Sequence, residues 1–147
     1  MNAYHGGCHC GLIQVTYFTA LDPATWPLRH DGCSFCTKHA VVATSDPAGS
    51  VGFEFRDAAR VHRYRFGTRS ADFLICDTCG VFVAAVTATP AGARAVINAR
   101  TFTDVPLDFN RVALASLDGE STEVRHARRL RNWTPVRDSP WGKAQPL

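Results

Sequence analysis

Short apolar runs, and no long helical repeats, dominate the hydrophobic pattern of the chain. The run Leu12–Phe18 is rich in β-branched and aromatic residues, and Val61–Phe66 places His62, Tyr64 and Phe66 on one face of an extended segment. No segment shows a helical period of convincing length. The pattern therefore predicts a mainly β protein.

Four more segments complete the predicted strands: Asp72–Ile75, Val81–Thr87, Arg94–Asn98 and Arg111–Leu117. The run Val81–Thr87 is apolar almost throughout, which is typical of a strand buried on both faces. Turn-forming pairs such as Asp46-Pro47 and Asp118-Gly119 separate the segments. Several short strands with frequent turns are the pattern of an antiparallel β domain.

The chain has the length of one ordinary domain. It contains 147 residues, of which 46% are hydrophobic, enough for one core. We expect a single domain at residues 1–133 and a loosely held C-terminal tail at residues 134–147. The first residues lack a signal-peptide pattern, and the longest apolar run is too short to cross a bilayer, so we expect no membrane partner and a cytoplasmic location. Nothing in the pattern predicts the oligomeric state.

The net charge of +3 is mild, but arginine is concentrated near the C-terminus. That region contains Arg125, Arg128, Arg129, Arg131, Arg137 and Lys143. A solvated surface explains such a concentration, and so does a site for an anionic substrate. Because the overall charge is small, nucleic acid is not expected as a partner.

Six cysteines occur as three close pairs, and this arrangement indicates metal binding. The pairs are Cys8 and Cys10, Cys33 and Cys36, and Cys76 and Cys79. A reducing compartment disfavours disulfides, and each pair has the spacing of half a tetrahedral zinc site. The spacing alone leaves three ways to combine two pairs into one site.

Three motifs in order, GGCHCGLIQVTY, CSFCTKH and FLICDTCGV, resemble the glutathione-dependent formaldehyde-activating family, also called the centromere protein V-type domain. The resemblance spans roughly residues 3 to 110. It implies an Mss4-like antiparallel β fold stapled by a structural zinc. It also assigns that zinc to the first and last pairs, Cys8, Cys10, Cys76 and Cys79.

The middle motif departs from the family pattern. That pattern, CxCSxC, holds a second, catalytic zinc with three thiolates, whereas here Asp31 takes the place of the first cysteine before Cys33 and Cys36. Aspartate ligates zinc but is a harder donor than thiolate. His30 and His39 are rival donors, and Asp31 also suits the role of capping a turn.

The resemblance implies an enzyme that joins or cleaves glutathione and formaldehyde at a carbon–sulfur bond, a lyase with zinc as cofactor and glutathione as co-substrate. Asp31, Cys33 and Cys36 would form its catalytic site. The alternative is a zinc-stabilised module without catalytic activity that binds a protein or nucleic acid. The two hypotheses differ in whether a second metal binds near Cys33.

Overall fold

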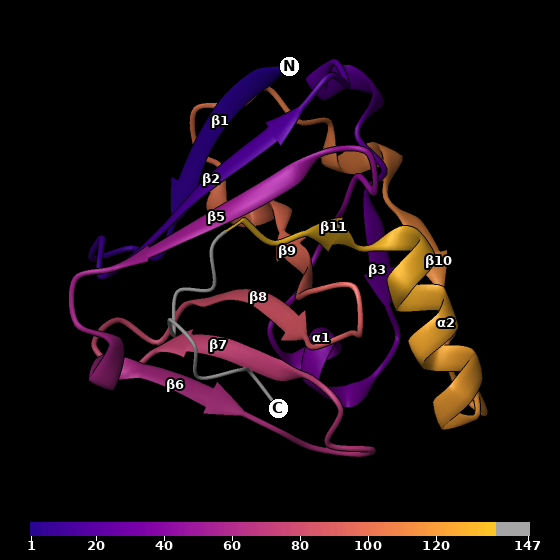
Figure 1. The fold of residues 1–147 in the computed structure, drawn as a ribbon. Coiled ribbons are helices and arrows are strands. Elements are labelled where there is room, and N and C mark those ends of the chain that lie inside the picture. Colours follow the sequence, from indigo (N-terminus) through magenta and orange to yellow (C-terminus); the bar gives the residue numbers. More distant parts are fainter. Residues whose placement is uncertain (138–147) are drawn as a thin grey trace.

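The computed structural model describes residues 1–137, which form two β-sheets and two α-helices (Figure 1). The smaller sheet is antiparallel, with strand order β1-β2-β5. Its strands are β1 (Asn2–Gly7), β2 (Ile13–Thr19) and β5 (Ser50–Phe55). Alternate residues of β2 are buried, as expected for a strand with one face on the core.

The larger sheet runs in the order β10-β3-β4-β9-β8-β7-β6, and the short strand β11 also pairs with β9. All its pairs are antiparallel except β10 with β3, which is parallel. The strands are β3 (Arg29–Asp31), β4 (Ala43–Thr44), β6 (Val61–Tyr64), β7 (Asp72–Cys76), β8 (Phe82–Thr87), β9 (Arg94–Asn98), β10 (Ala113–Ala115) and β11 (Thr134–Pro135).

The main core includes the inner faces of both sheets. The indole of Trp26 is fully buried there and contacts the rings of Tyr4, Tyr17 and Phe102 edge-on, with centroids 5.0 to 5.4 Å apart. All six residues of β8 are buried, which confirms the prediction of a strand covered on both faces. Figure 1 shows β7 and β8 below the strands of the smaller sheet.

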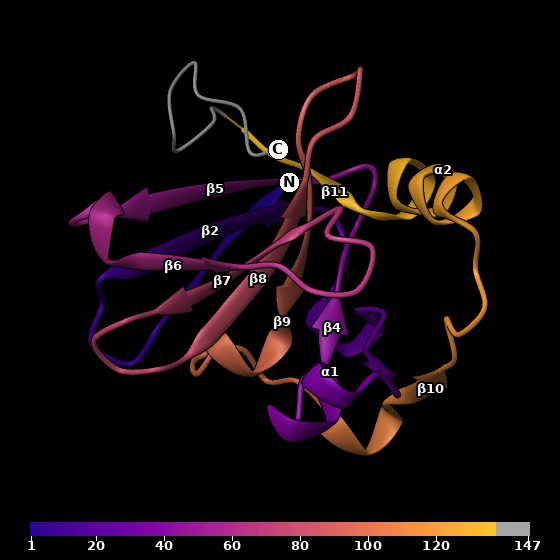
Figure 2. The ribbon, with the colours of Figure 1, turned by 90° about the horizontal axis from the view of Figure 1, so that it is seen from below.

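Two α-helices accompany the sheets. Helix α1 (Ser34–Lys38) follows β3, and helix α2 (Thr122–Asn132) lies at one side of the larger sheet (Figures 1 and 2). Single turns of 3-10 helix occur at Pro23–Thr25, Ala58–Arg60, Ala99–Thr101 and Phe109–Arg111.

Helix α2 corrects the expectation that the chain has no sizeable helix. Its sequence, TEVRHARRLRN, carries few apolar residues, and its valine and leucine are both exposed. The helix is stabilised instead by its N-cap, where the Ser121 hydroxyl accepts a hydrogen bond from Val124 N at 3.2 Å. The residue of α2 that is buried is Arg129. A hydrophobic pattern cannot reveal a helix that packs through an arginine side chain.

The predicted strands agree with β2, β6, β7, β8 and β9, and the last predicted segment shortens to β10. The sequence pattern did not predict β1 and β5, nor the short strands β3, β4 and β11. Strand β1 (NAYHGG) is polar, glycine-containing and half exposed, so it lacks the strong β pattern, and its pairing with β2 makes it a strand.

The beginning of the predicted tail belongs to the described fold. Thr134 is fully buried and pairs with Ala95, and its hydroxyl accepts a hydrogen bond from Asp46 N at 2.9 Å. The rest of the predicted tail, residues 138–147, lies outside the described residues. None of the helices within residues 1–137 is long and apolar enough to cross a membrane.

Candidate functional site

Four cysteines from the first and last motifs meet in one cluster. The sulfur atoms of Cys8, Cys10, Cys76 and Cys79 all lie within 4.8 Å of one another. Cys10 Sγ is 3.8 Å from Cys8 Sγ and 3.5 Å from Cys76 Sγ. Of the three combinations that the spacing left open, the structure brings this one together. A group of four thiols at these separations could hold a metal ion.

Backbone N–H groups point at two of these sulfurs. Ile13 N donates to Cys8 Sγ at 3.2 Å, and Cys79 N donates to Cys76 Sγ at 3.5 Å. Such N–H donors favour the thiolate form, which is the form that binds metals. Cys8 and Cys76 are also buried, so water has little access to them.

The thiols of this cluster compete for protons. Burial opposes ionisation of Cys79, but hydrogen bonds from the backbone N–H groups of Val81 and Cys10 lower its pKa from 9.0 to about 6. A backbone hydrogen bond from Leu12 lowers the pKa of Cys10, yet desolvation and the neighbouring thiols raise it overall from 9.0 to about 11. Without a cation, therefore, one thiolate suppresses the ionisation of another. A bound dication removes this repulsion.

A second cluster lies where β3 ends and α1 begins. Asp31, Cys33 and Cys36 each offer one ligand atom within 4.8 Å of the others. Cys33 is the N-cap of α1, and its Sγ accepts a hydrogen bond from Cys36 N at 3.3 Å. Asp31 Oδ1 accepts from Cys33 N at 3.0 Å, which is the turn-capping role that the sequence also allowed. Three donors could hold a metal ion and leave a coordination position open.

The electrostatics of this cluster also favour a cation. Burial, a hydrogen bond with the Cys33 thiol and the charges of Cys33 and Asp31 together raise the pKa of the Cys36 thiol. Cys36 therefore stays protonated unless a positive charge stabilises its thiolate.

The rival histidines do not join the cluster. His39 ends α1 and is exposed, and its ring stacks on that of Phe35 with centroids 4.4 Å apart. His30 Nδ1 lies 3.0 Å from the carbonyl oxygen of Val41. Within residues 1–137, neither histidine belongs to a group of potential metal ligands. The suggestion of His39 as an alternative ligand is therefore not supported, because the helix end directs its ring onto an aromatic neighbour.

The second cluster lines a cavity of about 580 Å³, which is a normal size for a small-molecule site. The aromatic part of its wall consists of Phe66, Phe73, Phe82 and Trp133. Four arginines also line it, namely Arg29, Arg125, Arg128 and Arg129. The concentration of arginine near the C-terminus is visible in the sequence, but no sequence signal places Arg125, Arg128 and Arg129 beside the middle cysteine motif.

No family model matches the chain, and no curated protein matches it. Among solved structures, the chain is similar to the crystal structure of a Rhodobacter sphaeroides protein that was a Northeast Structural Genomics target. The two chains share 25% sequence identity with a TM-score of 0.59, over 76% of this chain and 99% of the other. This likeness concerns the fold.

Proposed function

We propose that the protein is a zinc-dependent enzyme of the carbon–sulfur lyase type that acts on an adduct of glutathione and an aldehyde. The observation that carries this proposal is the location of Asp31, Cys33 and Cys36 in the wall of a cavity large enough for a small substrate. The resemblance of the three cysteine motifs to the glutathione-dependent formaldehyde-activating family, with its Mss4-like fold, supports the same proposal.

The two clusters have different roles in this proposal. Cys8, Cys10, Cys76 and Cys79 provide four thiol ligands and suit a closed structural zinc site. Asp31, Cys33 and Cys36 provide three ligands beside the cavity and suit an open site. A zinc ion held by the second set would supply Lewis acidity and a coordination position for the thiol or the carbonyl.

The proposed reaction joins the thiol sulfur to the carbonyl carbon. The thiol proton ends on the carbonyl oxygen, which becomes the hydroxyl group of the adduct, and cleavage is the reverse. The Asp31 carboxylate either completes the zinc site or accepts the thiol proton. The aromatic wall, which includes Phe82 and Trp133, would limit the contact of the reacting groups with water.

The first test is the amount of zinc per chain, measured by elemental analysis of protein purified without chelator, for the natural protein and for Cys33→Ser. We expect two zinc ions per chain, falling to one in the variant. NMR exchange between formaldehyde, glutathione and S-hydroxymethylglutathione then tests the activity, which the variant should lose. A single zinc that Cys33→Ser leaves in place, with no acceleration of exchange, would favour the zinc-stabilised binding module instead.

A further inference from the structure

Positive charge collects in one part of the cavity. Arg125, Arg128 and Arg129 of α2 are spaced so that they share one helix face, and Arg29 of β3 joins them in the cavity wall. Asp31 and Asp118 are the acidic residues among those that line the cavity. If Asp31 ligates a metal, its charge is no longer available to the arginines.

The carboxylate partners of these arginines are few. Glu120 accepts two hydrogen bonds from Arg128, at 2.9 and 3.0 Å, and lies 3.9 Å from Arg125 Nε. Arg29 is held differently, because its Nη2 donates to Ser45 Oγ at 2.8 Å. Within the described part of the chain, Arg29 and Arg129 form no ion pair. Within residues 1–137, Glu120 is therefore the carboxylate that pairs with this group of arginines, whose guanidinium ions repel one another.

Arg129 is the most informative member of the group because it is 6% exposed. Its Nη1 donates to the carbonyl and the hydroxyl of Ser70, and its guanidinium lies 4.9 Å from the centroid of the Trp133 ring. Among residues 1–137, its buried Nε finds no hydrogen-bond partner, and neither does the buried Nε of Arg125. Burial, together with the charges of Arg125 and Arg128, lowers the pKa of Arg129 from 12.5 to about 10.

A buried cation with an unused donor is costly unless a ligand completes its surroundings. Guanidinium groups are well suited to bind planar or tetrahedral oxyanions, since their N–H groups match the oxygen spacing. We infer that the arginine-lined part of the cavity is a subsite for an oxyanion, a carboxylate or a phosphate group of the ligand. This inference goes beyond the proposed function, because the subsite stands whether or not the ligand is transformed.

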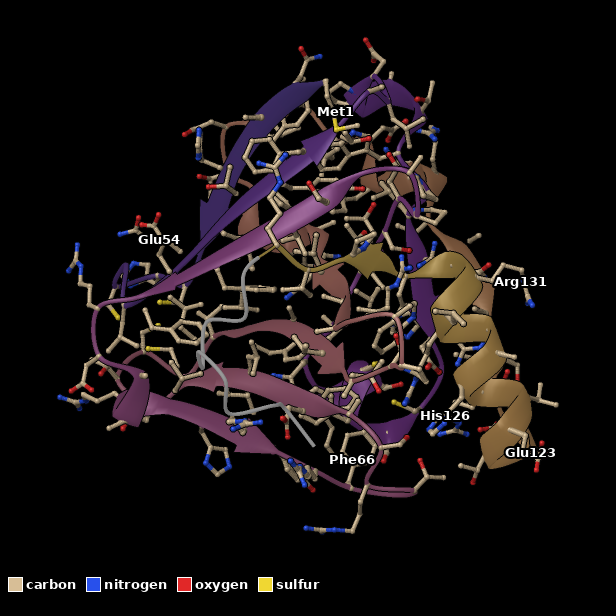
Figure 3. The ribbon with its side chains drawn as sticks, in the orientation of Figure 1. Met1, Glu54, Phe66, Glu123, His126 and Arg131 are labelled. Carbon is tan, nitrogen blue, oxygen red and sulfur yellow. The ribbon has the colours of Figure 1, made fainter. Side chains whose placement is uncertain are left out.

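The test is an NMR titration of the full chain with inorganic phosphate and, separately, with acetate, at an ionic strength held constant with chloride. The key variants are Arg125→Met and Arg29→Met, which spare the buried Arg129. The matched control is Arg131→Met, because Arg131 lies on the same helix but is exposed and points outward (Figure 3). We expect saturable binding that weakens about tenfold or more in both key variants and is unchanged in the control, as for loss of a charge-assisted hydrogen bond.

Saturable binding of acetate alone identifies a carboxylate ligand, and binding of phosphate alone identifies a phosphate ester; either result supports the subsite. The inference is overturned if neither anion saturates, or if Arg131→Met weakens binding as much as Arg125→Met does. The double variant Cys33→Ser, Cys36→Ser separates this inference from the proposed function. It should retain anion binding while losing any lyase activity.

Discussion

Cys10 and Cys76 lie 66 positions apart in the chain, yet their sulfur atoms are 3.5 Å apart. Cys10 precedes β2 of the smaller sheet, and Cys76 ends β7 of the larger sheet. The cysteine cluster therefore joins the two sheets at one point. A metal ion bound there would close a long loop, and such a link stabilises the folded state strongly.

Replacement of Cys76 tests this link. Cys76 is fully buried, and Cys76→Ser removes one of four donors, so we expect loss of bound metal and of cooperative thermal unfolding. Differential scanning calorimetry with elemental analysis measures both. The control is Cys33→Ser, which alters only the second cluster and should still unfold cooperatively. Retention of metal and melting temperature in Cys76→Ser would refute the assignment of Cys76 as a ligand.

Asp31 is expected to weaken the second cluster as a metal site. Aspartate is a harder donor than thiolate, so Asp31→Cys should bind zinc about tenfold more tightly or better, and Asp31→Asn should bind it more weakly. Competition with a chromogenic chelator measures the affinities. Asp118→Asn is the matched control, since Asp118 also lines the cavity but does not belong to the cluster. Equal affinity of all four proteins would show that Asp31 only caps the turn.

Asp72 is a buried anion shared by two arginines. Its carboxylate accepts hydrogen bonds from Arg63 Nε at 3.0 Å and from Arg65 Nε at 2.6 Å, and its side chain is 0% exposed. Removal of this charge breaks the ion pairs of the buried Asp72 with Arg63 and Arg65 at the β6–β7 edge. We expect Asp72→Asn to lower the free energy of unfolding by about 3 kcal/mol, measured by urea denaturation.

The exposed pair of Asp77 and Arg60 provides the comparison for Asp72. Their side chains are 43% and 53% exposed, with Asp77 Oδ1 at 3.1 Å from Arg60 Nε. Asp77→Asn should therefore cost less than about 1 kcal/mol. If Asp77→Asn were as destabilising as Asp72→Asn, the role of burial in the Asp72 network would be refuted.

Glu120 should make stability depend on pH in the acidic range. Hydrogen bonds from Arg128 hold the pKa of Glu120 below its ordinary value of 4.5. A lowered carboxyl pKa contributes stability that is present above pH 4.5 and is lost as the pH falls through the folded-state pKa. The contribution should be about 1 kcal/mol or less, because the side chain is partly exposed.

Urea unfolding of the natural protein and of Glu120→Gln, at several pH values on both sides of 4.5, measures this effect. The variant should be less stable at neutral pH and should approach the natural protein in acid. Glu123→Gln is the control, since Glu123 lies on the exposed side of α2 (Figure 3). A stability difference that stays constant down to pH 3 would contradict the prediction.

The local sequence was sufficient to predict most of the longer strands and the role of the cysteine pairs as metal-binding candidates. Strand β8 could be predicted because a run of apolar residues needs burial on both sides, and each cysteine pair because two close thiols can bind one ion. Asp31 could be named as a candidate donor because the middle motif resembles the family pattern CxCSxC, in which Asp31 takes the place of the first cysteine. These properties depend on neighbours a few positions away.

Only the tertiary structure decided which pairs combine and what surrounds the second cluster. Cys10 meets Cys76 because two sheets pack together, and that pairing depends on contacts between distant segments. Helix α2 has too few apolar residues to be predicted from its pattern, yet its packing brings Arg129 into the wall of the cavity that Cys36 also lines. The arginine face of α2 and the junction of β3 with α1 converge only in three dimensions, so the joint site of metal donors and arginines could not be predicted from the sequence.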